Sequence, residues 1–166
     1  MKRNTTGHVA RYGMLSALAF IFSYIEMLIP INLGIPGVKL GLANLVVFIA
    51  LYMEGWKGAF GISMVRIILV GFTFSNTFSM LYSLAGGILS FLVMLLCKKL
   101  KVFSKMGVSI AGGVSHNIGQ ITVAAFVVKN SGVFYYLPVL LVAGTITGAL
   151  IGILGGLILN RLNRIM

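Results

Sequence analysis

Charged residues are scarce in this chain, and acidic residues are nearly absent. Of the 166 residues, 13 are Lys or Arg and two are Asp or Glu, so charged residues make up 9% of the sequence. A soluble domain carries about 25% charged residues. The observed share is too small to solvate the surface of one globular domain of this length. The composition therefore argues strongly against a soluble fold.

Long apolar runs fill most of the sequence instead. Hydrophobic residues make up 59% of the chain, and 21 further residues are Gly. One crossing of a bilayer needs about 20 helical residues, so six crossings use about 120 residues and leave about 46 for ends and loops. Open sheets are excluded in lipid. The sequence therefore predicts a single all-α membrane domain over residues 1–166, with six transmembrane helices at about 9–29, 39–53, 58–74, 77–97, 108–128 and 135–159.

The distribution of Lys and Arg predicts the orientation of these spans, because basic residues collect in cytoplasmic loops. With the N-terminus inside, the outer segments contain only Lys39 and Lys129. The inner segments contain ten basic residues, namely Lys2, Arg3, Arg11, Lys57, Lys98, Lys99, Lys101, Lys105, Arg161 and Arg164. We therefore expect both termini to be cytoplasmic. The net charge of +11 then faces anionic lipid headgroups, and no nucleic acid partner is expected.

The missing residue types exclude several kinds of active site. The chain has no Asp, and its two acids, Glu26 and Glu54, are predicted near opposite membrane faces, so paired-carboxylate catalysis and an Asp-rich diphosphate–Mg²⁺ site are excluded. No P-loop motif is present. Cys97 is the single thiol and His116 the only histidine within a span, which is a poor set of metal ligands. We expect no enzymatic activity, no metal and no cofactor.

Arg66 lies near the middle of the predicted third span. A charge at mid-bilayer costs from about 2.5 to more than 10 kcal/mol, depending on the reference state, and therefore needs a partner. One interpretation is a structural Arg that carbonyls and polar groups of neighbouring spans satisfy. The other is an anchor for an anionic substrate group, because the forked guanidinium fits carboxylate and phosphate. We favour the anchor.

Polar residues form a stripe along the predicted fifth span. Ser109, Gly113, His116 and Gln120 are spaced by four, three and four residues, which places them on one side of a helix, with Asn117 beside them. Such side chains face protein or water and not lipid. The stripe predicts either a hydrogen-bond cluster between helices or, as we prefer, a wall in which His116, Asn117 and Gln120 contact a substrate.

The predicted fourth span has a similar stripe of small and polar residues. It consists of Asn76, Ser79, Ser83, Gly86 and Ser90, spaced by three, four, three and four residues. Close packing between helices explains most of this stripe. Asn76 and Ser79 are the best candidates there for ligand contacts, because they lie nearest the outer surface.

Two more spans carry stripes of small residues, which allow another backbone to approach closely. The sixth span has glycine at every fourth position, at Gly144, Gly148, Gly152 and Gly156. The first span has Ala10, Gly13 and Ala17. These stripes are interfaces, either within the protein or with another protein, and the sequence alone leaves both alternatives open.

Lys39 and Asn44 flank the start of the second span. Lys39 either extends its ammonium group to the membrane surface or meets an anion that arrives from outside. Glu26, near the outer end of the first span, is placed to pair with it. Asn44 is a candidate for a directional hydrogen bond to the same ligand.

The combination of these motifs resembles the bacterial Gx transporter family, whose members are often labelled heptaprenyl diphosphate synthase component I. The matching segments are 36–44, Arg66, 83–90, 107–113 and 116–120. The resemblance runs from the first span to the glycine-rich last span. It implies a multi-pass protein of the bacterial cell membrane.

That family in turn is similar to the substrate-binding S components of energy-coupling factor (ECF) transporters. The resemblance implies a six-helix bundle that captures a small, anionic molecule from the outer side. It also implies a membrane coupling subunit that contacts Ala10, Gly13 and Ala17, and two cytoplasmic ATPases that supply energy. The alternative is a membrane accessory component of heptaprenyl diphosphate synthesis or of menaquinone and prenyl metabolism.

Overall fold

The computed structural model describes residues 5–28, 41–75 and 77–164, and every element in these ranges is a helix. The elements are α1 (Thr5–Leu28), α2 (Leu42–Met53), α3 (Gly55–Thr73), α4 (Thr77–Leu100), α5 (Lys105–Val128), the short 3₁₀ helix η1 (Ser131–Tyr136) and α6 (Leu137–Leu162). The all-α fold class predicted from the sequence is confirmed.

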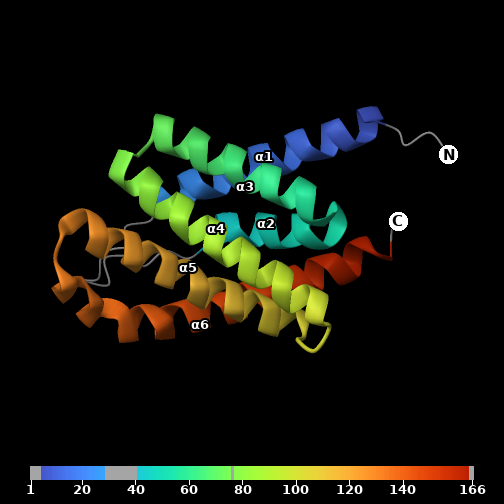
Figure 1. The fold of residues 1–166 in the computed structure, drawn as a ribbon. Helices are drawn as coiled ribbons and strands as arrows, with labels where there is room; N and C mark the ends of the chain where they lie inside the picture. The colour runs from blue at the N-terminus through green and yellow to red at the C-terminus, as the bar shows by residue number, and fades with distance from the viewer. Residues whose placement is uncertain (1–4, 29–40, 76, 165–166) are drawn as a thin grey trace.

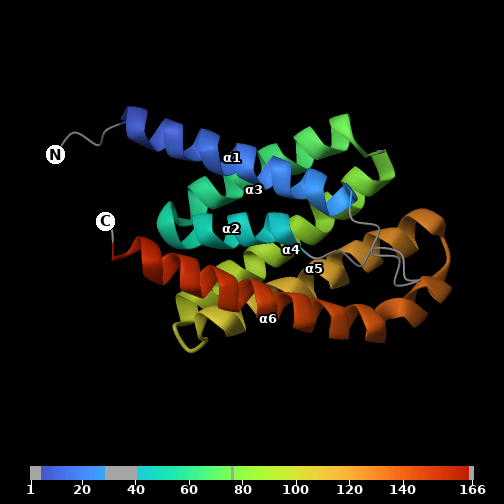
Figure 2. The same cartoon turned by 180° about the vertical axis from the view of Figure 1, so that it is seen from behind.

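The helices run back and forth between two ends of one bundle (Figure 1). One end carries the start of α1, the α2–α3 turn, the α4–α5 loop and the end of α6, and the other end carries the α3–α4 turn and η1 (Figures 1 and 2). α5 packs most extensively, against α4 on one side and α6 on the other. We call the first of these ends the basic end, because it holds Arg11, Lys57, Lys98, Lys99, Lys101, Lys105, Arg161 and Arg164.

The shortest α-helix, α2, is the most buried element. Eight of its 12 residues are buried, and it contacts α1, α3 and α6. Its ends are set by glycine: Gly41 precedes it with φ of 72°, and Gly55 follows Glu54 with φ of 79°, so the chain reverses directly into α3. A positive φ of this kind is readily adopted only by glycine. Twelve residues span roughly 18 Å, so α2 crosses only part of the bundle.

Glycines bring the backbones of α5 and α6 into contact. A Cβ atom on Gly144 would lie 2.9 Å from the carbonyl oxygen of Gly113, and one on Gly148 would lie 2.7 Å from Cα of Ile110. A Cβ atom on Gly152 would lie 2.7 Å from a backbone atom of α5 as well. Three of the four glycines in the stripe of the sixth predicted span therefore form an interface inside the protein, whereas no atom of the described chain lies within 4 Å of a Cβ built on Gly156.

Buried polar contacts fix two further helices at the basic end. The carboxylate of Glu54, 2% exposed, forms an ion pair with Arg11 at 3.0 Å and lies 3.1 Å from Nδ1 of His8, which holds α1 against the α2–α3 turn. Lys98 of α4 donates a hydrogen bond to the carbonyl of Leu51 at 2.6 Å, and its ammonium lies 4.5 Å from the ring centre of Tyr52. These contacts position α1 and α4 relative to α2.

Three helical segments within the described residues are long and apolar enough to cross a membrane. They are Gly55–Thr73, Thr77–Leu100 and Ser131–Leu162, and Leu42–Met53 is a shorter apolar helix. The six helices overlap the six segments that the sequence predicts as spans. The count of six membrane crossings stays a prediction.

The α5–α6 contact predicts opposite effects of one substitution at two glycines. Gly148→Ala should destabilise the protein by about 1 to 3 kcal/mol, because the added methyl meets backbone atoms that cannot move aside easily. Gly156→Ala is the matched control on the same helix, where no atom lies within 4 Å of the added Cβ. It should be neutral or stabilising by up to about 1 kcal/mol, since Ala favours helix more than Gly does. Thermal unfolding of the two purified variants in detergent measures both changes in stability. Equal melting temperatures of Gly148→Ala and Gly156→Ala would contradict the close packing of α6 on α5.

Candidate functional site

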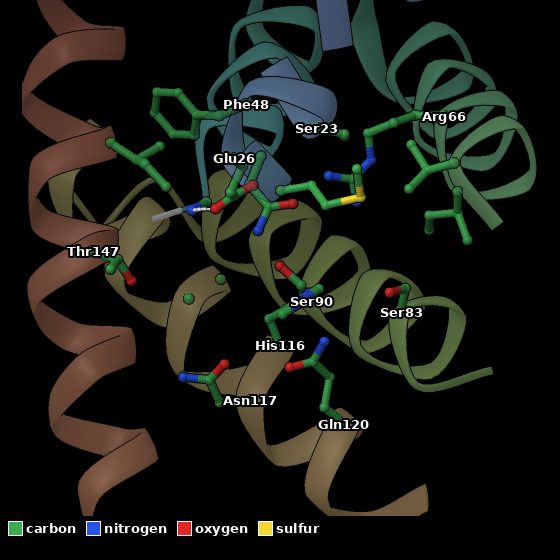
Figure 3. A pocket seen from close by; sticks show the side chains of 18 of the residues that line it. Ser23, Glu26, Phe48, Arg66, Ser83, Ser90, His116, Asn117, Gln120 and Thr147 are labelled. Carbon is green, nitrogen blue, oxygen red and sulfur yellow. Dashed lines mark hydrogen bonds between the residues drawn. The ribbon is translucent and has the colours of Figure 1, made fainter. Parts of the chain in front are cut away.

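A cavity of about 190 Å³ lies inside the bundle, lined by residues of α1 to α6 (Figure 3). Its polar lining consists of Ser23, Glu26, Asn44, Arg66, Ser75, Ser83, Ser90, Ser109, His116, Asn117, Gln120 and Thr147. Its apolar lining consists of Met27, Phe48, Ile67, Val70, Phe74, Met80, Met94 and Ile151, with glycines of α3 and α5 between them. The cavity therefore combines many hydrogen-bonding groups with flexible and aromatic apolar walls.

The polar stripe of the fifth predicted span forms one wall of this cavity. Ser109, Gly113, His116 and Gln120 all line it, and so does Asn117. Small residues make this possible, because a Cβ atom on Gly119 would lie 2.9 Å from the carbonyl oxygen of Ala85 on α4. α5 is thus held tightly between its neighbours, and its polar side chains turn toward the space that α4 and α6 leave open.

Arg66 contributes the positive charge of the cavity. Its side chain is 9% exposed, and its Nε atom has no hydrogen-bond partner among the described residues. Glu26 interacts favourably with the guanidinium through space. An unsatisfied buried donor on a charged group is costly. The structure therefore places a buried cation with unused hydrogen-bonding capacity at the cavity wall.

Glu26 contributes the negative charge. Its Oε1 atom accepts a hydrogen bond from the backbone N–H of Gly41, which joins the end of α1 to the start of α2. In Figure 3 the side chains of Glu26 and Arg66 project toward the same space from α1 and α3. From the sequence, Glu26 is expected to pair with Lys39 and is not among the predicted site residues. The sequence nevertheless indicates a special role for Glu26, because burying an acidic side chain within an apolar span costs free energy, as burying Arg66 does.

Some polar groups of the lining are already satisfied by nearby carbonyls. Asn117 Nδ2 donates to the carbonyl of Leu140 on α6 at 2.6 Å. The hydroxyls of Ser23 and Thr147 donate to carbonyls of their own helices, both at 2.9 Å. These bonds satisfy the donors and stabilise the bundle. Asn117 therefore has a structural contact in addition to its place in the wall.

Other polar groups of the lining have unused hydrogen-bonding capacity. Within the part of the chain that the structure describes, no hydrogen bond involves the side chains of Asn44, Ser83, Ser90, Ser109 or Gln120. Buried polar groups are almost always paired with protein, water or ligand. These five residues can therefore accept and donate hydrogen bonds to whatever occupies the cavity.

The remaining residues singled out by the sequence lie elsewhere. Ser79 is on α4 but does not line the cavity, and Lys39 and Asn76 lie outside the described residues. Ala10, Gly13 and Ala17 are on an exposed face of α1, and no atom lies within 4 Å of a Cβ built on Gly13. Unlike the stripe on α6, this stripe has no helix of the described chain packed closely on it. Its role as a partner interface stays a prediction.

Three residues of the lining, Ser23, Phe48 and Thr147, carry no signal in the sequence that predicts their place in the site. Thr147 lies within the glycine stripe of α6, directly before Gly148, and its hydroxyl bonds to a carbonyl of its own helix. Its sequence context therefore does not distinguish it from other threonines in helices. Phe48 lies among the continuous apolar residues of α2, which gives no periodic signal. No group of three His, Cys, Asp or Glu side chains that could hold a metal ion occurs among residues 5–28, 41–75 and 77–164.

Comparison with known proteins identifies the family. The chain belongs to the heptaprenyl diphosphate synthase component I family, whose family model matches residues 15–158. This range contains every residue that lines the cavity. No curated protein and no solved structure matches the chain. The family resemblance inferred from the sequence motifs is confirmed.

The hydrogen bonds of the lining predict that two neighbouring amides have different roles. Asn117→Ala should destabilise the protein by about 1 to 3 kcal/mol, because it removes the bond to Leu140 and leaves a void between α5 and α6. Gln120→Ala removes no hydrogen bond within the described chain and should change stability by at most about 0.5 kcal/mol. Thermal unfolding of the two variants in detergent tests this difference, and a larger loss of stability in Gln120→Ala than in Asn117→Ala would contradict the assigned roles.

Proposed function

We propose that the protein is embedded in a membrane and captures a small molecule in the cavity beside Arg66, as the S subunit of an ECF-type importer. The observation that carries this proposal is a buried guanidinium with an unpaired Nε donor in the wall of a cavity rich in unused polar groups. A bundle Arg with a purely structural role would be satisfied by its neighbours. Functional sites are where proteins tolerate such costs.

The surface of the bundle supports the membrane location. Large apolar side chains are exposed on the outward faces of the helices, among them Phe72 at 80% and Phe126 at 84%. Exposed apolar surface of this extent is unusual for a soluble monomer. The basic end supports the proposed orientation, because Lys and Arg collect on the cytoplasmic side. Both termini and the α4–α5 loop are then cytoplasmic, and η1 faces outward.

This orientation predicts the accessibility of single cysteines introduced at two loops. In a Cys97→Ala background, a cysteine replacing Lys101 should be labelled only after the membrane is permeabilised. A cysteine replacing Ser131, at the start of η1, should react with an impermeant maleimide in intact cells. The reverse pattern, or labelling of both positions from outside, would contradict the orientation.

The chemistry of the lining supports a small ligand with an acidic group. The guanidinium of Arg66 matches carboxylate or phosphate, with Lys39 assisting at the entry, and Asn44, His116 and Gln120 supply directional hydrogen bonds. An apolar cavity of about 150 Å³ holds one benzene molecule, and drug-sized ligands occupy about 300 Å³ or more. A cavity of about 190 Å³ therefore suits a small metabolite and not a complete seven-unit isoprenoid chain.

Delivery of the ligand then depends on partners. The chain has no P-loop, so energy would come from two cytoplasmic ATPases through a membrane coupling subunit. The exposed small residues Ala10, Gly13 and Ala17 on α1 offer a surface that allows another helix to approach closely. No segment of the described chain covers Gly13.

Removal of the guanidinium should abolish capture. Protein purified from its host membrane should carry a small molecule that mass spectrometry detects after denaturation. Arg66→Ala should lower its recovery at least tenfold, because a charged hydrogen-bonded pair is lost. Lys99→Ala is a matched control, since it removes an exposed cation at the basic end, outside the cavity lining. Equal recovery from wild type and Arg66→Ala would contradict the assignment.

The family description favours one alternative function. Its wording names a component of heptaprenyl diphosphate synthase, which agrees with a membrane accessory subunit in prenyl or menaquinone metabolism. The proteins in the same purified preparation separate the two proposals. A coupling subunit and two ATPases support import, whereas a soluble prenyl synthase without them supports the accessory role.

A further inference from the structure

A glycine of α6 lies directly behind one wall of the cavity. Thr147 and Ile151 line the cavity from α6, and Gly155 follows one helical turn later on the same face but is not part of the lining. The ring of Phe48 occupies the place of the missing side chain, because a Cβ atom on Gly155 would lie 2.6 Å from Cδ1 and 2.7 Å from Cε1 of Phe48. Gly155 therefore determines where the Phe48 ring lies relative to the cavity.

The ring of Phe48 has little room to move except toward the cavity. It is fully buried, and its centre lies 5.0 Å from the ring centre of Tyr52. The ammonium group of Lys98 lies 4.5 Å from the same Tyr52 ring. Protein interiors are packed as densely as organic crystals, so the cavity is the open space into which a displaced Phe48 ring can move. A methyl group added at Gly155 would therefore reduce the space for a ligand.

Gly87 of α4 has the same relation to a second residue of the lining. A Cβ atom on Gly87 would lie 2.7 Å from Cδ1 of Ile67, and the only other atom within 4 Å belongs to another side chain. Ile67, which follows Arg66 in the sequence, lines the cavity, whereas Gly87 does not. An added methyl group would meet the end of one flexible side chain and no backbone atom. It would therefore displace the Ile67 side chain and leave the helices in place.

We propose that Gly155 and Gly87 are specificity-determining residues, which set the size of the uncharged part of the ligand without touching it. This inference rests on the proposed function, that the cavity captures a small acidic molecule at Arg66. With the acidic group at the guanidinium, the uncharged part lies against Phe48 and Ile67 in a cavity of about 190 Å³. One methylene group in an apolar pocket changes affinity about tenfold or more. The volume of a single methyl group behind the wall therefore decides which ligand fits.

Straight-chain monocarboxylates from acetate to octanoate test the proposal. Titration calorimetry with the purified full-length protein measures the affinity for each acid, and the wild type should bind one chain length best. In Gly155→Ala the best chain length should be shorter by at least one methylene group, and the acid that the wild type prefers should bind at least tenfold more weakly. Gly156→Ala is the matched control, since no atom lies within 4 Å of the same methyl group at the next position of α6. Its best chain length should equal that of the wild type.

Substitution of Phe48 separates the size of the cavity from a general loss of stability. Phe48→Leu should shift the best chain length in the opposite direction, toward a longer acid. The double variant Gly155→Ala/Phe48→Leu nearly conserves the total side-chain volume, and its best chain length should return to within one methylene group of the wild type.

The same best chain length in wild type, Gly155→Ala and Phe48→Leu would overturn the proposal. If Gly155→Ala does not fold, Phe48→Leu and the double variant decide by the same criterion. Gly87→Ala should shorten the preferred acid as Gly155→Ala does, and an unchanged preference there would overturn the assignment of Gly87.

Failure of this inference can be distinguished from failure of the proposed function. If acids bind and are lost in Arg66→Ala, but the preferred chain length is the same in every glycine variant, only the role of the glycines is overturned. If a molecule co-purifies with the wild type but no straight-chain acid binds, again only this inference is overturned. If no molecule co-purifies and no acid binds, both are overturned.

Discussion

The burial of one guanidinium between apolar helices is the constraint on which the rest of the structure depends. Arg66 is 9% exposed in a chain whose charged residues make up only 9% of the sequence. A charge in such surroundings is stable only when the groups around it are arranged for it. Glu26 attracts the guanidinium through space, and the polar side of α5 and the serines of α4 line the same cavity. The Nε donor of Arg66 nevertheless has no partner among the described residues, so the cavity contains a buried cation whose hydrogen-bonding capacity is not used up by the protein.

Close packing by glycine makes the arrangement possible. α5 is pressed against α4 at Gly86 and Gly119 and against α6 at Gly113 and Gly144. The small Gly86 of α4 also leaves room for the side chains of His116 and Gln120, which lie directly against it and line the cavity. The short, buried α2 adds Asn44 and Phe48 to the same space. Close contacts of α5 with both of its neighbours thus position the polar side chains of the cavity wall.

Sequence patterns predicted the residues that stand out from their surroundings. Six apolar runs separated by Pro, Gly and Lys predicted the six helices, and Arg66 and the α5 stripe were visible as polar exceptions within them. All five of Arg66, Asn44, His116, Asn117 and Gln120 line the cavity. Their role in binding stays a prediction, because position alone does not demonstrate contact with a ligand.

Other features, such as the partner of the glycine stripe and the exact lining of the cavity, depend on the tertiary structure and have no unique pattern in the sequence. The spacing of Gly144, Gly148 and Gly152 predicted an interface but not its partner, because close approach to α5 and to a second protein need the same small residues. Ser79 and Ser83 share one face of α4, yet only Ser83 lines the cavity, because the position along the helix axis decides which one reaches it. The hydrogen bond from Asn117 to the carbonyl of Leu140 cannot be predicted from the sequence, because it depends on how α5 and α6 are aligned.

An experimental structure of the protein purified from its own membrane, without added ligand, tests the central claim most directly. We predict density for a small molecule in the cavity, with one of its atoms within hydrogen-bond distance of the Arg66 guanidinium. A collapsed cavity in which the guanidinium is fully satisfied by protein groups would show that Arg66 stabilises the bundle only, and would contradict the account.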